Sequence, residues 1–207
     1  MVIDEPALLR AWAAGDKSAG ERLFARYYKP LTRFFVNKVR STDEVEDLVQ
    51  RSFMAMVEAA PRFRGTSSVR TWVFGIARNL LRQFYDKRRR DAGVGGSDEL
   101  SVADFDAPGA STLVRAKAEQ KLLLQALRNL PLETQVMVEL FYWEEMKSRE
   151  IGEVLGMPEG TVRTKLRKAR ADIEASLARL AREPALVEST VENLEGWAKG
   201  LRELWGV

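Results

Sequence analysis

The sequence predicts an all-α protein built from two small helical domains. Apolar residues recur three and four positions apart along most of its 207 residues, and alternating β-branched runs and Asn-Gly hairpin turns are missing from it. The periodicity stops over residues 91–114, which contain four glycines, one proline and five acids but no Lys or Arg. This composition is typical of a flexible, acidic linker. We therefore expect domains at 1–92 and 115–182, a linker at 93–114 and an extension at 183–207.

Four helices are expected in the first domain, because four apolar stripes follow one another along it. They cover residues 8–12, 23–35, 45–57 and 69–81, and the first helix should end near Gly15. Each stripe can be buried against the others, which stabilises the fold by about 1.5–3 kcal/mol per large apolar side chain. Such a set of amphipathic helices predicts a compact bundle.

The second domain is expected to contain two helices followed by a helix-turn-helix. Apolar stripes predict helices at 122–127 and at 131–143, the latter opened by Pro131. Residues 148–173 then read SREIGEVLGMPEGTVRTKLRKARADI, which is two amphipathic segments around a Gly-Met-Pro turn.

Local signals place this turn and assign a face to the helix that follows it. Ser148 suits an N-cap, Gly156 suits a left-handed C-cap and Pro158 fits the first position of the next helix. That helix carries an apolar side of Val162, Leu166, Ala169 and Ile173, and cations elsewhere at Arg163, Lys165, Arg167, Lys168 and Arg170. A basic helix held on its domain by one stripe is typical of a helix that enters a DNA groove. A solvated basic helix end, or an αα-hairpin without a ligand, is the alternative.

Several classes of function are excluded by composition. The sequence contains no cysteine and no histidine, so a disulfide framework, a Cys/His zinc site and a Cys/His nucleophile–base pair are impossible. We expect no metal, no cofactor and no catalytic residue. The chain begins without a basic region followed by an apolar run, and nowhere do 18 apolar residues run together. We therefore expect a cytoplasmic protein without membrane insertion.

Charge is segregated along the first domain. Residues 62–90 contain nine Lys or Arg and a single acid, with five aromatic residues interleaved. Cations that follow a backbone and aromatic faces for unstacked bases are the parts of a surface for single-stranded nucleic acid. Trp72 shares a stripe with Val69 and Ile76, so packing alone can explain it. The stacking role is better assigned to Phe63 and the FRGTSS loop.

The segment just before it has the opposite charge. Residues 43–58 carry five acids and one cation, Arg51. A nucleic-acid backbone would repel this face, which therefore suits a protein partner. The acids at the start of the segment also suit the positive end of a helix dipole, and the two explanations are left open at this point.

The order of these segments resembles that of one protein family. The motifs are LLRAWAAGDKSAGERLFARYYKPL, DEVEDLVQRSFMAM, FRGTSSVRTWVFGIARNLLRQFYDKRR, LPLETQVMVELFYWEEMKSREIGEVLG and PEGTVRTKLRKARADI. In this order they resemble the bacterial RNA polymerase sigma factors of the sigma-70 family, in the two-domain extracytoplasmic-function (ECF) group. Residues 1–92 resemble sigma domain 2, and residues 115–181 resemble sigma domain 4. The resemblance implies a specificity subunit, not an enzyme, that binds the β′ and β subunits of core RNA polymerase and opens promoter DNA.

The resemblance also implies roles for individual residues. Core-polymerase binding, against the clamp helices of β′, would fall to Asp43, Asp47, Leu48, Gln50 and Phe53. The −10 strand would meet Phe63, Arg64, Ser67, Arg70, Arg78, Asn79 and Arg82, with the FRGTSS loop capturing a flipped base. The −35 element would meet Ser148, Thr161, Arg163, Thr164, Arg167, Lys168 and Arg170 in the major groove. Two positions depart from the family pattern: Arg51 stands where relatives often have an acidic or uncharged residue, and Arg167 where they often have an aromatic residue or His.

The extension goes beyond what a minimal family member needs. Its apolar residues form a helical stripe of Val187, Val191, Leu194, Trp197, Leu201, Leu204 and Trp205, and its net charge is negative. We expect an amphipathic helix that docks on either domain and moderates binding, or one that extends the core of the second domain. The family also implies an anti-sigma factor as a partner, a role that self-inhibition by this helix would replace. An ordinary helix-turn-helix regulator and a nucleic-acid enzyme are the other classes considered, and the segments 43–58 and 62–72 argue against the first.

Overall fold

The structure is a computed structural model that describes residues 4–91, 93, 118–180 and 196. Within these residues the chain forms eight α-helices and one short 3-10 helix, and it forms no strand. The all-α prediction is confirmed. Nearly all of the predicted linker and of the extension 183–207 lies outside the described residues, so the domain boundaries stay predictions.

The first domain is a bundle of four helices, as predicted. They are α1 (Glu5–Ala13), α2 (Lys17–Val36), α3 (Thr42–Ala59) and α4 (Val69–Asp91), with a 3-10 turn, η1 (Ala60–Arg62), after α3. Polar residues fix where three of these helices begin. The carboxylates of Asp4 and Asp16 accept backbone N–H groups at the starts of α1 and α2, and Ser41 with Glu44 makes a capping box for α3.

The predicted apolar stripes form the centre of this bundle. Leu9, Leu23, Leu31, Phe35, Leu48, Met56, Val73 and Phe74 have no exposed surface. They come from all four helices, so most of each stripe is buried against the others, whereas Phe24 and Val57 of the predicted stripes are exposed.

The second domain contains α6 (Ala118–Arg128), α7 (Leu132–Tyr142), α8 (Ser148–Leu155) and α9 (Glu159–Leu180). Helices α8 and α9 form the predicted helix-turn-helix. Two details of its boundaries differ by one residue from the prediction. Lys147, not Ser148, is the N-cap of α8, because its N–H reaches the Glu150 carboxylate at 2.8 Å. Pro158 lies just before α9 rather than in its first position, and its carbonyl accepts from Thr161.

Two glycines make the turn between α8 and α9 possible. Gly156 ends α8 with φ of 69°, in the left-handed region that other residues adopt at a cost of about 1–2 kcal/mol. At Gly152, a Cβ atom would stand 2.6 Å from the carbonyl oxygen of Met157. The close approach of the turn to α8 therefore requires glycine at this position.

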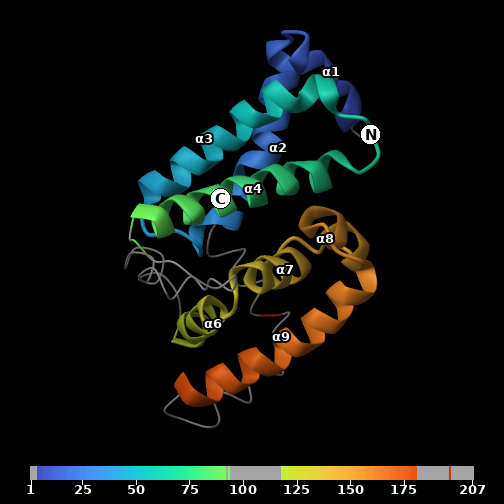
Figure 1. Cartoon of the computed structure of the whole chain (residues 1–207). Coiled ribbons are helices and arrows are strands. Elements are labelled where there is room, and N and C mark those ends of the chain that lie inside the picture. Colours follow the sequence, from blue (N-terminus) through green and yellow to red (C-terminus); the bar gives the residue numbers. More distant parts are fainter. Residues whose placement is uncertain (1–3, 92, 94–117, 181–195, 197–207) are drawn as a thin grey trace.

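The two domains pack directly on each other, which the sequence did not predict. Helix α4 lies against α8, and α2 lies against α7. Val136, Ile151 and Val154 of the second domain belong to the same buried cluster as the core of the first. Figure 1 shows α4 along the boundary between the domains, and α9 on the outer side of the second domain. None of the described helices is long and apolar enough to cross a membrane.

Candidate nucleic-acid and protein interfaces

Helix α9 holds its position through the predicted stripe. Val162, Ala169 and Ile173 are buried, and Leu166 is half-buried. The predicted contact residues Thr161, Arg163, Thr164, Arg167, Lys168 and Arg170 are all exposed, and Ser148 lies half-buried at the start of α8. The stripe thus leaves a continuous polar and cationic face toward solvent.

Three cations of α9 are paired with acids four residues away. Arg163 pairs with Glu159, Lys168 with Asp172 at 3.4 Å, and Arg170 with Glu174 at 3.3 Å. The side chains of these cations are 54–79% exposed. Pairs of this kind contribute about 0.3–0.5 kcal/mol, so a phosphate or a base edge can replace the acid at little cost.

The loop before α4 forms a small pocket with α4 itself. Its walls on the first domain include Thr66, Ser67, Thr71, Trp72 and Asn79. The ring of Trp72 also packs against the ring of Phe63, with centroids 5.2 Å apart and an angle of 55° between their planes. Both aromatic residues are half-buried, so the packing role considered for Trp72 holds, and Phe63 packs as well. Asn79 lines this pocket, and Arg64, Asn79 and Arg82 are all exposed.

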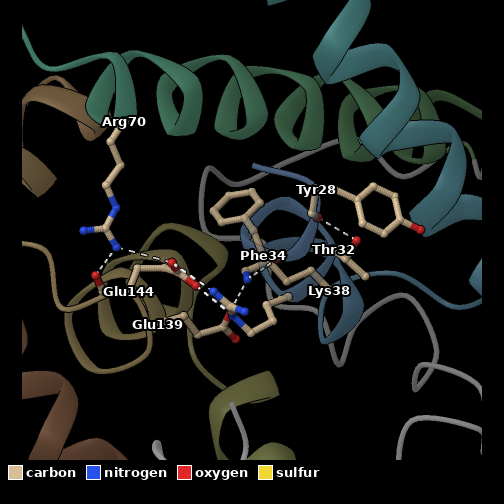
Figure 2. A network of polar contacts seen from close by, with 8 residues as sticks. Tyr28, Thr32, Phe34, Lys38, Arg70, Glu139 and Glu144 are labelled. Atoms are coloured by element: carbon tan, nitrogen blue, oxygen red, sulfur yellow. Dashed lines mark hydrogen bonds and ion pairs between the residues drawn. The ribbon is translucent and has the colours of Figure 1, made fainter. Parts of the chain in front are cut away.

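The other two predicted −10 arginines are engaged by the second domain. Arg70 donates to the backbone carbonyl and to Oε2 of Glu144, the latter at 3.3 Å, as Figure 2 shows. Glu144 also accepts two hydrogen bonds from Arg33, at 3.1 and 3.4 Å. Arg78 forms a two-bond pair with Glu133, in which its Nε lies 3.2 Å from Oε2. These glutamates come from α7 and the residues that follow it.

A buried polar network continues this contact inward. Lys38 pairs with Glu139 and also donates to the carbonyl of Phe34 at 2.6 Å. Asn37 donates to Glu139 at 3.2 Å and accepts from Arg128 Nε at 2.9 Å. Burial lowers the pKa of Lys38 and raises the pKa of Glu139, while the attraction between them opposes both shifts.

Burial also affects Arg128, the second cation of this network. Desolvation lowers the pKa of Arg128 to about 10, although the charge of Glu139 opposes the shift. One Nη atom of this guanidinium is buried without a hydrogen-bond partner. Lys38 is thus buried in a direct pair with Glu139, whereas Arg128 is buried with Asn37 as its hydrogen-bond partner, and burying these charges opposes the stability of the interface.

Helix α3 presents most of its predicted contact residues to solvent. Asp43, Asp47 and Gln50 are exposed, whereas Leu48 has no exposed surface. Leu48 therefore packs in the core of the bundle in this conformation, and its role as a contact residue stays a prediction. Arg51, which departs from the family pattern, is paired with Asp47 at 3.4 Å. The charge of a predicted contact residue is therefore partly neutralised by this arginine.

An apolar groove lies beside these acids, and of its lining residues only Gln50 and Phe53 were among the predicted contact residues. It is lined by Trp12, Phe24, Tyr28, Val49, Phe53, Met54 and Val57, with Glu46 and Gln50 at its edge. Phe24 is 48% exposed and Met54 is 55% exposed, although Phe24 belongs to a stripe that was expected to be buried. Phe24 stacks on Tyr28 with ring centroids 5.1 Å apart and contacts Phe53 at 4.7 Å. In the sequence, the signal for this groove was that the apolar faces of the segments forming α2 and α3 are wider than a single helical stripe.

The described residues contain no group of acids that could hold a metal ion. Their candidate surfaces are instead a cationic helix face, a loop pocket with arginines and an acidic, partly apolar face.

Comparisons with known proteins agree on one family. The family model for sigma-70 region 2 matches residues 23–91, and the model for sigma-70 region 4 matches residues 120–173. The sigma-H factor of Pseudomonas aeruginosa is 29% identical over 178 residues, covering 82% of this chain and 91% of its own length. Sigma factor YlaC of Bacillus subtilis is 26% identical over 161 residues, covering 77% and 92%. The ECF sigma-E factor of Escherichia coli is 25% identical over 187 residues, covering 87% and 97%.

Two solved structures share the fold. CnrH, in complex with the cytosolic domain of CnrY, is 24% identical with a TM-score of 0.57, and covers 86% of this chain and 99% of its own. The sigma factor RpoE of Bartonella quintana, in complex with the anti-sigma factor NepR, is 20% identical with a TM-score of 0.60, covering 76% and 96%. The two matched regions span more than half of the sequence in the family's order, and both lie on the helices that carry the candidate surfaces. This chain is a member of the sigma-70 family of RNA polymerase sigma factors, in its extracytoplasmic-function group.

Proposed function

We propose that this sigma factor binds core RNA polymerase through α3 and its groove, reads the −35 element with α9, and captures the −10 strand with the loop before α4 and with α4 itself. The observation that carries this proposal is the separation of charge over one short chain. An exposed cationic helix, a loop pocket among arginines, and an acidic face with exposed apolar residues occupy three different surfaces.

Helix α9 has the dimensions and charges of a helix that reads duplex DNA. Its first turns project Arg163, Thr164 and Arg167 away from the buried stripe. An arginine that binds a guanine edge with two hydrogen bonds contributes about 1–3 kcal/mol of discrimination, and flanking cations bind phosphates without regard to sequence. Arg163 and Arg167 are proposed to read bases, while Lys168 and Arg170 neutralise the backbone.

The loop pocket has the composition expected for an unstacked base. Hydroxyl groups of Thr66, Ser67 and Thr71 and the amide of Asn79 can satisfy the polar edge of a base, and Trp72 offers an apolar wall. Removing a base from its stack costs a few kcal/mol, which such contacts can offset. Arg64, Arg70, Arg78 and Arg82 are proposed to follow the phosphates of the same strand.

The acidic face of α3 and the apolar groove form one surface for the polymerase. Asp43, Asp47 and Gln50 are exposed along α3, and Met54 of the same helix lines the groove. Exposed aromatic and methionine side chains with a polar rim are typical of the centre of a protein–protein interface. The complementary partner is a cationic, amphipathic helical surface, which is the character that the family implies for the β′ clamp.

Regulation by a second protein is part of the proposal. The titles of the two solved structures describe sigma factors bound to CnrY and to the anti-sigma factor NepR. We propose that this chain also takes an anti-sigma partner. Self-inhibition by the extension 183–207 stays the alternative, because that segment lies outside the described residues.

Reconstitution with bacterial core polymerase on a library of genomic promoters tests this function. We expect transcripts whose start sites share two upstream elements, and we expect Asp47→Arg to lower core binding without changing binding to −35 duplexes. Glu159→Arg is the matched control for core binding. It also reverses the charge of an exposed acid, but that acid lies outside the proposed core surface, so core binding should not change. Sequence-specific duplex binding without any association with core would contradict the proposal and favour an ordinary helix-turn-helix regulator.

A further inference from the structure

The apolar groove has a third wall that α2 and α3 do not provide. Trp12, in the last turn of α1, lines the groove together with Phe24 and Tyr28 of α2 and Phe53 of α3. The indole meets the Phe53 ring edge-on, with ring centroids 6.5 Å apart and an angle of 67° between the planes. Trp12 is half-buried, so part of its surface is open to a molecule that enters the groove.

The indole reaches this wall by lying against α2 at Gly20, which is buried. A Cβ atom at Gly20 would stand 2.5 Å from Cδ1 of Trp12 and 3.1 Å from Cε2, and it would be closer still to Nε1. Carbon atoms that are not bonded prefer separations of about 3.5–4.0 Å. Any side chain at this position would therefore push the indole out of its place.

Neither backbone conformation nor helix formation explains a glycine at this position. Gly20 lies in the first turns of α2, and its φ is not in the left-handed range. Glycine is a poorer helix former than every residue except proline, so alanine would suit α2 better by propensity alone. The close approach of the Trp12 indole is the physical reason that remains.

Contacts elsewhere on α1 hold that helix without help from the indole. Glu5 accepts a hydrogen bond from the hydroxyl of Tyr27 at 2.9 Å and pairs with Arg26, both of α2. Leu9 has no exposed surface. Because these contacts lie nearer the start of α1, the indole can be displaced while α1 keeps its place on the bundle.

We propose that Gly20 is a positioning residue for the binding of core polymerase: its lack of a side chain seats Trp12 as the third wall of the groove, where the indole contacts the polymerase beside Phe24 and Met54. The inference rests on the proposed function, which assigns the groove to core polymerase. Tryptophan is enriched among the residues that dominate the binding energy of protein interfaces, since its ring buries a large apolar area.

A double-mutant cycle on the full chain tests whether Gly20 acts through Trp12. Affinity for core polymerase is measured by competition with the labelled parent chain. We expect Gly20→Ala to lower this affinity about fivefold and Trp12→Ala about tenfold. The combined variant should bind as weakly as Trp12→Ala alone, because the added methyl group then has no indole to displace. Losses that multiply to about fiftyfold would mean that the two positions act independently, and would overturn the proposal.

Fluorine NMR separates a displaced ring from general damage to the fold. The chain contains five tryptophans, which can be labelled with 5-fluorotryptophan, and the signal that disappears in Trp12→Ala belongs to Trp12. We expect Gly20→Ala to shift this signal and to leave the others in place. An unmoved Trp12 signal, or a shift of every signal, would overturn the positioning role.

Two further variants complete the design. Gly160→Ala is the matched control, because it adds a methyl group to another helical glycine with nothing within 4 Å, and it should change neither core affinity nor the Trp12 signal. Phe24→Ser distinguishes failure of this inference from failure of the proposed function. If it lowers core affinity and Trp12→Ala does not, the groove binds polymerase and only the third wall is wrong. If neither variant lowers core affinity, the groove is not part of the interface and that part of the proposed function is wrong as well.

Discussion

The ammonium group of Lys38 and the carboxylate of Glu139 form an ion pair across the domain boundary, with 0% and 2% of their side chains exposed. Asn37 and Gln135 complete the hydrogen bonds of the carboxylate, at 3.2 and 2.8 Å. Desolvation opposes the charge on both partners, as the lowered pKa of Lys38 and the raised pKa of Glu139 indicate. The pair therefore selects one arrangement of the domains without being a strong source of stability.

Removing one member of this pair should cost more than removing both. Glu139→Gln leaves the buried Lys38 charge without its directly paired carboxylate, and we expect a loss of about 3–5 kcal/mol in the free energy of unfolding. Lys38→Met with Glu139→Leu should be close to neutral, because two apolar side chains of similar size replace the two charges. Urea denaturation at pH 7 measures both. A loss below about 1 kcal/mol for Glu139→Gln would mean that Lys38 reaches water and that the domains are already separated in solution.

Gly152→Ala should destabilise the helix-turn-helix, because the new Cβ would press on the carbonyl oxygen of Met157. We expect a loss of about 1–3 kcal/mol, visible as a lower melting temperature by circular dichroism. Gly160→Ala is the matched control, since a Cβ there meets nothing within 4 Å. It should be neutral or stabilise by up to about 1 kcal/mol. Equal effects of the two substitutions would contradict the close approach of the turn to α8.

Arg51→Ala should strengthen binding to core polymerase. Arg51 pairs with Asp47 at 3.4 Å, and the pair is exposed, so its removal releases the acid at an expected cost to stability below 1 kcal/mol. The released acid can then meet a cationic partner without first losing this contact. We expect affinity for core to rise about two- to fivefold in a competition assay, which corresponds to the strength of an exposed pair. Arg149→Ala, which removes an exposed cation paired with Glu153 on α8, should leave core affinity unchanged.

The apolar groove should contribute to core binding without contributing much to folding. Phe24→Ser and Met54→Ser truncate side chains that are 48% and 55% exposed. We expect each to lower core affinity about tenfold, because exposed aromatic and methionine side chains at the centre of an interface carry much of its energy. Leu180→Ser is the control, since that leucine is 37% exposed and lies in α9, far along the chain from the groove. Unchanged core affinity in both groove variants would exclude the groove from the interface.

The helices could be predicted from the sequence because their signals are local. The stripe through Leu23, Tyr27 and Leu31 is complete within three turns of α2, and the cap at Ser41 lies beside the helix that it starts. The turn at Gly156 was predicted for the same reason. The differences at Lys147 and Pro158 amount to one residue each, which is the usual spread of helix ends.

The interface between the domains could not be predicted, because its partners lie far apart in the sequence. Lys38 and Glu139 are separated by 101 positions, and Arg70 and Glu144 by 74. No local pattern marks Glu139 as buried, since one acid within an apolar run also fits a solvent-facing position. The same limit explains Leu48, which fits either a core or a contact surface on α3 until the packing of the other helices is known. The predicted contact residues of α9 needed no such information, because the stripe at Val162 and Ile173 orients the whole helix.

Substitutions on α9 should separate reading of bases from attraction to the backbone. Arg163→Ala should lower discrimination between the mapped −35 sequence and a variant with one changed base pair by about 1–3 kcal/mol, because a two-bond contact to a base edge is lost. Lys168→Ala should weaken binding to all duplexes alike and reduce the slope of log affinity against log salt by about one. Fluorescence anisotropy at four salt concentrations on both duplexes measures the two effects together. The partners of these cations, Glu159 and Asp172, are exposed in either case, so folding should be unaffected. A uniform loss for Arg163→Ala with a lower salt slope would reassign this arginine to a phosphate and leave base reading to Arg167 and the threonines beside it.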